Sequence, residues 1–123
     1  MKTRSRTNTG LTKLAVAAIE DLKGFDIKVL DVRALTAITD SMVICTGTSS
    51  RHVKSIADNV VDKFRQHGLR ARGVEGFEQG EWVLVDLGAV VVHVMQLNAR
   101  VFYQLEKLWD IHEHAKPAVA AAG

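Results

Sequence analysis

Apolar residues follow helical spacing in some stretches of the chain and strand patterns in others, and these stretches predict the secondary structure. Apolar residues at helical spacing over residues 11–22 predict a first helix, and Gly24 stands where a left-handed cap would end it. Residues 27–32 predict a strand. Residues 42–46 are apolar almost throughout, which is typical of a strand buried inside a sheet. The first part of the chain therefore predicts one helix followed by two strands.

The rest of the chain predicts two more helices and three more strands. A helix with one apolar stripe opens after Ser49 and ends at Gly68. Residues 70–74 predict a short strand, and residues 81–87 and 90–96 predict a hairpin. A last helix, capped by Asn98, has an apolar stripe formed by Val101, Phe102, Leu105, Leu108 and Trp109. The order α-β-β-α-β-β-β-α favours the α/β class, with a mixed β-sheet flanked by helices.

The chain has the length and composition of a single globular domain. Its 123 residues are 47% hydrophobic and 24% charged, which excludes disordered and fibrous proteins. No linker or repeat divides the sequence, and no apolar run approaches the ~20 residues that span a bilayer. We predict one domain over residues 11–114, with a basic flexible tail over residues 1–10 and an Ala-rich flexible tail over residues 115–123.

Charge is distributed unevenly along the chain. The net charge is +2, but four basic residues and no acid stand within residues 1–13. Without these four, 12 basic and 14 acidic residues remain, so the body of the domain has a net charge of −2. Residues 74–99 contain no Lys or Arg and four acids, which are Glu75, Glu78, Glu81 and Asp86. This segment is either a solvated acidic loop or a surface suited to a basic partner.

The cysteine and histidine residues predict no disulfide, no metal site and no cofactor. Cys45 is the only cysteine and stands in an apolar strand, so we expect a core residue in a cytoplasmic protein. His112 and His114 have ligand spacing but stand near the fraying C-terminal end, where solvent-facing side chains are the simpler interpretation. His93 alternates with Val91 and Met95 on one side of its strand, which predicts a hydrogen-bonded core or interface residue.

The segment Gly47-Thr48-Ser49-Ser50 joins a strand to a helix and admits two interpretations. Free amides at a helix start bind phosphate, and nucleotidyltransferases begin their site with such a turn. Their chemistry also needs two close carboxylates that hold Mg²⁺, whereas Asp86 stands alone in its strand. We therefore favour helix capping by a hydroxyl side chain. A nucleotidyltransferase-like enzyme and an RNA-binding module led by the basic tail stay open as alternatives.

Two predicted surfaces combine an aromatic residue with acids. Alternation in the strand over residues 81–87 places Trp82, Leu84 and Asp86 on one face. Helices packed on the sheet could leave part of the Trp82 side bare for a partner. Opposite the apolar stripe of the last helix lie Tyr103, Glu106, Asp110 and Glu113. This second surface is either a partner-binding face or a solvated helix face.

Five segments match, in order and at compatible spacing, the sequence pattern of one known family. They are Asp40–His52 (DSMVICTGTSSRH), Val74–Gly76 (VEG), Gly80–Gly88 (GEWVLVDLG), Val91–His93 (VVH) and Arg100–Trp109 (RVFYQLEKLW). On these segments the chain resembles the ribosomal silencing factor S family, also called the Iojap-like family. Met42 and Ala89 depart from the pattern, because members usually have an aromatic and an acidic residue at these positions.

The resemblance implies a translation repressor that is not an enzyme and needs no cofactor or small-molecule substrate. Members bind the large ribosomal subunit through ribosomal protein uL-fourteen and sterically block joining of the small subunit under nutrient limitation or in stationary phase. The resemblance also implies a nucleotidyltransferase-like fold and a homodimer when free. The residues that match family motifs and are predicted to contact the ribosomal protein are Trp82, Asp86, Tyr103 and Glu106. Charge and expected exposure add Glu75, Phe77, Glu78, His93, Met95 and Asp110.

Overall fold

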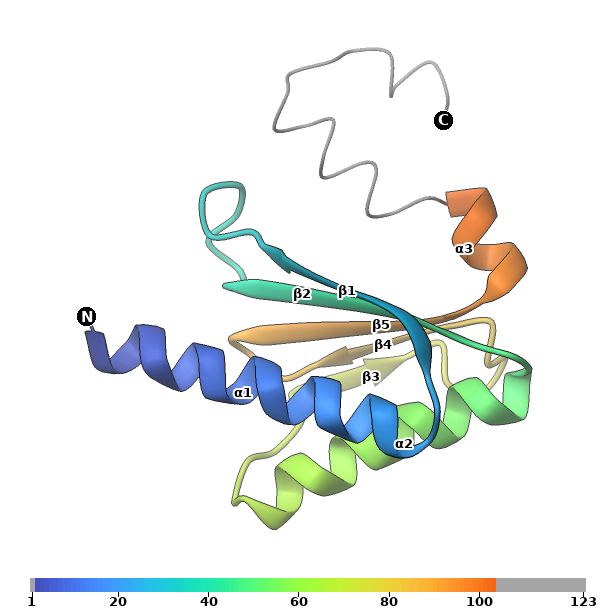
Figure 1. Cartoon of the computed structure of the whole chain (residues 1–123), viewed down its shortest axis with the longest axis horizontal. Coiled ribbons are helices and arrows are strands. Elements are labelled where there is room, and N and C mark those ends of the chain that lie inside the picture. The colour runs from blue at the N-terminus through green and yellow to red at the C-terminus, as the bar shows by residue number, and fades with distance from the viewer. Residues whose placement is uncertain (1, 104–123) are drawn as a thin grey trace.

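The elements form in the predicted order along residues 2–103, the part of the chain that the computed structural model describes (Figure 1). The helices are α1 (Lys2–Asp21), α2 (Ser50–Gln66) and α3 (Leu97–Tyr103). The strands are β1 (Phe25–Asp31), β2 (Ser41–Gly47), β3 (Gly73–Glu75), β4 (Trp82–Asp86) and β5 (Val90–Gln96). The chain is therefore an α/β protein, as its hydrophobic pattern predicts.

The five strands form one mixed sheet in the order β1-β2-β5-β4-β3. β2 and β5 run parallel, with Ser41 beside Val90 and Gly47 beside Gln96, and all other neighbouring strands are antiparallel. β5 lies at the centre, and every residue of the adjacent β2 is buried. The prediction of a buried interior strand over residues 42–46 is confirmed.

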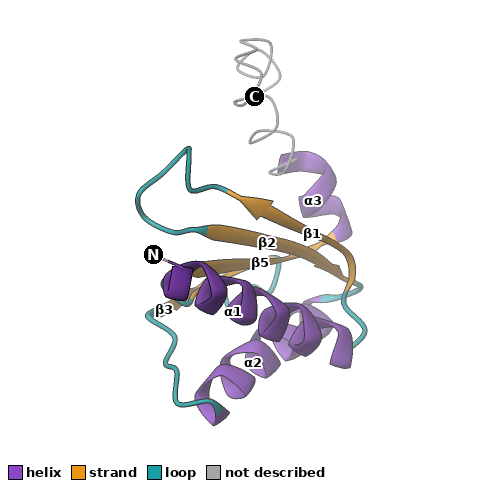
Figure 2. Ribbon diagram, turned by 60° about the vertical axis from the view of Figure 1, so that its left-hand side comes forward, coloured by secondary structure: helices purple, strands orange, loops and turns teal. Residues whose placement is uncertain are grey.

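α1 and α2 cover one face of the sheet, and α3 lies on the other face (Figures 1 and 2). The main core lies between the two long helices and the sheet, since every second strand residue points toward them. α2 contributes its predicted stripe to this core: Val53, Ile56, Ala57, Val60 and Phe64. Asn59 also donates a 2.8 Å hydrogen bond from Nδ2 to the carbonyl of Ala18, which joins α2 to α1.

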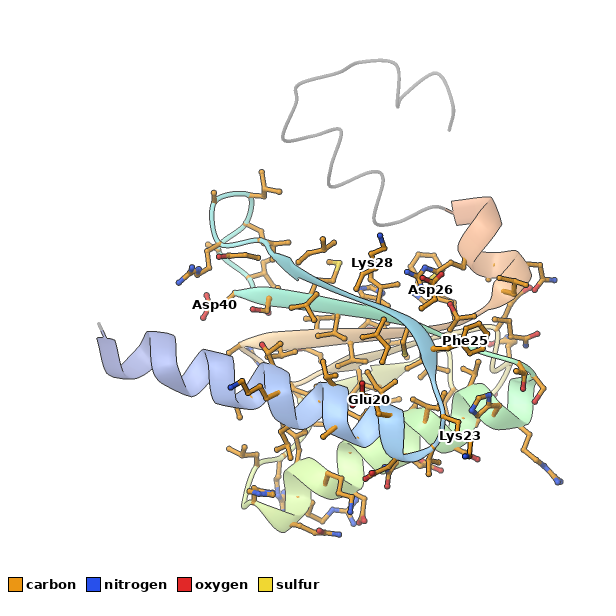
Figure 3. All side chains as sticks on the ribbon, viewed as in Figure 1. Glu20, Lys23, Phe25, Asp26, Lys28 and Asp40 are labelled. Carbon is orange, nitrogen blue, oxygen red and sulfur yellow. The ribbon has the colours of Figure 1, made fainter. Side chains whose placement is uncertain are left out.

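A smaller core lies on the face that carries α3. Its buried members are Val32, Met42, Ile44, Met95 and Ala99, with Leu30 and Trp82 packed against them. Nη1 of the buried Arg100 donates to the Asp26 carbonyl at 2.7 Å and to Thr46 Oγ1 at 2.8 Å. These bonds hold α3 against β1 and β2, and Asp26 lies at the end of β1 that adjoins α3 (Figure 3).

The turn between α1 and β1 differs from its prediction. Lys23 (φ 64°) and Asp26 (φ 52°), and not Gly24, adopt the left-handed conformation. Glycine is needed at position 24 for space, because a Cβ there would overlap the side chain of Ile19. The Gly24 amide donates to the Ile19 carbonyl at 3.0 Å and so closes the end of α1, with Lys23 at the bend (Figure 3).

The two terminal helices also begin earlier than the sequence predicts. α1 begins at Lys2 instead of Leu11, and the flexibility of residues 1–10 stays a prediction. α3 begins at Leu97, so Asn98 is its second residue and not its cap. Of the predicted stripe of the last helix, Leu105, Leu108 and Trp109 lie outside the described residues. Over residues 2–103, no helix is both long and hydrophobic enough to cross a membrane.

Candidate partner-binding face

Side chains of β3, β4 and β5 that point away from α1 and α2 form the face of the sheet proposed below as the binding site. Residues paired across neighbouring strands share a face, and the register places Glu75 beside Leu84 and Leu84 beside His93. The members of this surface, named here the Trp82 face, are Glu75, Trp82, Leu84, Asp86, Val91, His93 and Met95. Trp82, Leu84 and Asp86 are half-buried and Glu75 is exposed. The predicted alternation is confirmed, because Val83 and Val85 are fully buried on the opposite face.

Trp82 is fixed to the central strand by its indole nitrogen. Nε1 donates a 2.9 Å hydrogen bond to Nδ1 of His93, and the two ring centroids lie 5.8 Å apart at an interplanar angle of 46°. Burial lowers the pKa of His93 to about 4, so its ring is neutral at physiological pH and can accept this bond. The prediction that His93 is a hydrogen-bonded core or interface residue is confirmed.

Two residues of the predicted contact set are too deeply buried to touch a partner in this conformation. Met95 has no exposed surface and packs in the smaller core with Ala99 and Ile44. His93 is only 5% exposed. Their prediction as contact residues rested on charge and expected exposure, and neither argument includes the cover that α3 and Trp82 provide. Both side chains are therefore buried members of the Trp82 face that support its exposed members.

Asp86 closes the hairpin between β4 and β5. Its Oδ1 accepts a 2.9 Å hydrogen bond from the amide of Gly88, and its carbonyl accepts a 2.6 Å bond from the amide of Arg72. Such a side-chain bond to an amide two residues on is the usual way in which Asp stabilises a turn. Asp86 is thus a structural residue of the hairpin, and its contact with a partner stays a prediction.

The loop between β3 and β4 carries Phe77 and Glu78 to different surroundings. Phe77 packs against the main core, and Nζ of Lys54 on α2 lies 5.7 Å from its ring centroid. Phe77 therefore lies on the α2 side of the sheet and does not join the Trp82 face. Glu78 is exposed on the same loop. Gly76 has φ 79°, and a Cβ there would overlap the carbonyl oxygen of Trp82, so glycine lets the loop pass close to β4.

The acidic segment has basic neighbours that its own sequence lacks. Glu75, Glu78 and Glu81 are exposed, as a partner-binding surface requires. Lys54 reaches the loop from α2, and the side chain of Arg72 passes beside Gly88. The absence of Lys and Arg from this segment of the sequence therefore does not make its surroundings purely acidic, because basic residues from other elements border it. Glu75 on β3 and Glu78 on the loop are exposed and remain available for a basic partner.

The start of α2 shows the capping that the sequence predicts. Ser49 Oγ accepts a 3.1 Å hydrogen bond from the amide of His52, and Nδ1 of His52 accepts a 2.9 Å bond from the amide of Thr48. Ser50 Oγ is also engaged, since it donates to the carbonyl of Gln79 at 3.0 Å. Two of the amides that a phosphate would need are thus already bonded within the chain.

Some of the predicted site residues lie within the part of the chain that the structure describes, and others lie outside it. Tyr103 is the last described residue of α3, and Glu106 and Asp110 lie outside the described residues. Sequence reasoning had set Leu84 on the Trp82 side without counting it as a contact, yet it is half-exposed between Trp82 and Asp86. It also missed Leu97, which is 57% exposed where β5 ends. No group of three or more His, Cys, Asp or Glu side chains within residues 2–103 could hold a metal ion.

Comparison with known proteins gives one consistent result. The family model described as "Ribosomal silencing factor during starvation" matches residues 5–122. The ribosomal silencing factor RsfS of Haemophilus influenzae is 48% identical over 99 residues, which cover 80% of this chain and 97% of that protein. A mouse protein named for mitochondrial assembly of the ribosomal large subunit is 32% identical over 101 residues, 80% of this chain and 44% of that protein.

A solved structure agrees with the sequence comparisons. The crystal structure of a Chromobacterium violaceum protein superposes with a TM-score of 0.82 at 47% identity. The match covers 83% of this chain and 85% of that chain. The structural similarity therefore extends over most of the length of both chains.

Proposed function

The chain belongs to the ribosomal silencing factor family, and from this premise we propose that it binds the large ribosomal subunit and prevents the small subunit from joining it. The result is repression of translation under nutrient limitation or in stationary phase. The observation that carries the proposal is the half-exposed Trp82, held in place on a sheet face bordered by exposed acids. The mouse relative named for assembly of the ribosomal large subunit supports this choice of subunit.

The proposed contact on the large subunit is ribosomal protein uL-fourteen. Aromatic side chains in the desolvated centre of an interface carry most of its binding energy, and acids around it guide a basic partner into place. Trp82 supplies the aromatic side chain, and Glu75 and Glu78 supply the acids. A surface of this kind suits a basic protein better than it suits RNA, whose phosphates the acids would repel.

The proposed mechanism is steric and requires no chemical step. A domain of this size is about 30 Å across, so a molecule bound on the face where the subunits meet would fill the space of the approaching small subunit. The bonded amides at the start of α2 support a function without nucleotide chemistry, as does the engagement of Asp86 in its own hairpin. Pyrophosphate release from nucleoside triphosphates with Mg²⁺, abolished by Asp86→Asn, would support the alternative of a nucleotidyltransferase-like enzyme.

Purified ribosomal subunits give a direct test. The protein is added to large subunits before small subunits, and the products are separated on a sucrose gradient. We expect the protein to sediment with large subunits only and to shift the profile from joined ribosomes to free subunits. Unchanged joining at a several-fold excess of protein would contradict the proposal.

Ile38→Ala is the matched control for variants of the Trp82 face. Ile38 is 79% exposed and precedes β2, at the end of the sheet opposite to Trp82. Removing it changes a large apolar surface residue without touching the proposed contact. The RNA-binding alternative predicts a different result: affinity should fall steeply as the salt concentration rises, and it should depend on the basic tail and not on the residues of the Trp82 face.

We also propose that the free protein is a cytoplasmic homodimer. The support is the resemblance to the ribosomal silencing factor family, which implies a homodimer when the protein is free of the ribosome. Sedimentation equilibrium of the protein with and without large subunits measures the mass of each species. A monomer at all concentrations would contradict the dimer.

A further inference from the structure

We propose that His93, which is too deeply buried to reach a partner itself, is a positioning residue that fixes the orientation of the Trp82 indole. The orientation depends on one tautomer of the imidazole, in which Nδ1 accepts and Nε2 carries the proton. The inference rests on the proposed function only for its binding measurement. The positioning itself is a property of the free protein and is measured there.

The tautomer follows from the chemistry of the two rings. The indole nitrogen of tryptophan can only donate, so Nδ1 of His93 must accept at the observed 2.9 Å and cannot carry a proton. Burial disfavours the charged ring, which would have a proton on both nitrogens. The single proton of the neutral imidazole is therefore on Nε2.

The other nitrogen shows that stability alone does not explain a histidine at this position. Nε2 of His93 is buried without a hydrogen-bond partner among the described residues. A buried N–H without an acceptor is costly, and an apolar side chain such as leucine would fill the sheet face between Leu84 and Ile44 without that cost. The bond to Trp82 is what the imidazole provides and leucine cannot.

A fixed indole suits a binding anchor. Trp82 is half-buried and packs, like Leu30, against the smaller core, so its ring system is held while part of it stays exposed. An anchor that already has its bound orientation loses less side-chain freedom when a partner binds. His93 thus acts on binding through Trp82. The two residues belong to adjacent same-face pairs of β4 and β5, since His93 pairs with Leu84 and Trp82 pairs with Met95.

Two substitutions separate the hydrogen bond from the packing. Asn places an amide oxygen close to the position of the imidazole Nδ1, so His93→Asn keeps an acceptor for the indole. His93→Leu has similar bulk and no acceptor. NMR of ¹⁵N-labelled free protein should show His93 as the Nε2-protonated tautomer, and the Trp82 indole proton, assigned with Trp82→Phe, should be protected from exchange with solvent. That protection should persist in His93→Asn and be lost in His93→Leu.

Binding to large ribosomal subunits then tests the consequence. Loss of one hydrogen bond predicts that His93→Leu binds about fivefold more weakly, with His93→Asn close to the wild type. In the Trp82→Phe background, whose ring has no N–H, replacing His93 by Leu should change affinity little. An equal loss in both backgrounds, an unprotected indole in the wild type, or the Nδ1-protonated tautomer would overturn the assignment. If wild-type protein binds no large subunits, the proposed function fails, and the NMR comparison still decides the positioning role.

Discussion

The guanidinium of Arg100 on α3 donates a 2.8 Å hydrogen bond to the hydroxyl of Thr46 on β2, and both side chains are buried. The same Nη1 reaches the carbonyl of Asp26 at 2.7 Å, and the Asp26 carboxylate lies 3.9 Å away. One side chain thus connects α3 with the first two strands of the sheet. α3 covers the smaller core in which Met95 lies and against which Trp82 packs, so this contact supports the candidate binding face.

Replacing Arg100 by methionine should lower the stability of the fold considerably. The variant leaves the Thr46 hydroxyl and the Asp26 carbonyl without their charged donor, and breaking such buried interactions costs about 2–4 kcal/mol. Urea unfolding followed by circular dichroism measures the free energy of unfolding. The matched control is Arg33→Met, because Arg33 bonds Asp31 on the exposed edge of the sheet and should change the unfolding midpoint little. Equal midpoints for Arg100→Met and the wild type would contradict the role of the buried contact.

The order of the elements could be predicted because each has a local signal. The stripe of α2 from Val53 to Phe64 and the apolar run of β2 depend on side chains only a few positions apart. The left-handed residue after α1 had no such signal. Lys23 stands at the left-handed position of a helix cap in which its amide donates to the Glu20 carbonyl and the Gly24 amide donates to the Ile19 carbonyl. The crowding by Ile19 that requires glycine one residue later exists only in the folded turn.

Of the candidate site, the sequence could predict only which strand residues share a face of the sheet. Alternation placed Trp82 and Leu84 on one face and buried Val83 beneath the helices, as the structure confirms. It could not show that α3 and its neighbours bury Met95, because that cover comes from the packing of a separate element. The cation near Phe77 was hidden for the same reason, since Lys54 is 23 positions away in the chain.

Cys45 should react with thiol reagents only when the protein unfolds. Burial raises the pKa of its thiol to about 12, and the side chain has no exposed surface, so thiolate is scarce and inaccessible in the native state. At neutral pH, modification by a chromogenic disulfide should be slow and should accelerate with added urea in proportion to the unfolded fraction. Rapid stoichiometric labelling of native protein would contradict the assignment of Cys45 to the core.

Stability should fall as the pH decreases through the range below 6.5, because His93 must be neutral in the fold. Its pKa is lowered from 6.5 to about 4 by burial, so between these values the unfolded chain binds more protons than the native one. The part of the unfolding free energy that depends on neutral His93 is fully present above pH 6.5. It is lost as the pH approaches 4, and its total is about 3 kcal/mol. Among the described residues, the charged side chains on the same side of the sheet include Asp26, Lys28, Glu75, Asp86 and Arg100.

The variant His93→Asn isolates this contribution from that of the carboxylates. Unfolding free energies of the wild type and the variant are measured at pH 7 and near pH 4.5. The wild type should lose more stability between the two than His93→Asn does. His67→Asn removes an exposed imidazole and should keep the wild-type difference. If His93→Asn loses as much stability as the wild type, titration of His93 does not contribute.

Trp82 should dominate binding to the large subunit, with the acids acting mainly on the rate of association. Trp82→Ala should weaken binding by about 2 kcal/mol or more, the usual scale of an interface anchor. Reversal of Glu78 or Glu106 to Lys should slow association, and the effect should fade as salt screens the charges. Titrations against purified large subunits give the affinities, and stopped-flow mixing gives the rates.

Thermal melts separate binding from folding for the same variants. Trp82 packs against the smaller core, so Trp82→Ala should also lower the melting temperature somewhat. The binding experiment is therefore run well below the melting temperature of the variant, with Ile38→Ala as the control of unchanged affinity. If folded Trp82→Ala binds like the wild type, the anchor is elsewhere, and the next variants to test are Tyr103 at the end of α3 and the residues that follow it. If it is folded and does not bind, the free energy of association depends on the indole itself and not on the stability of the fold.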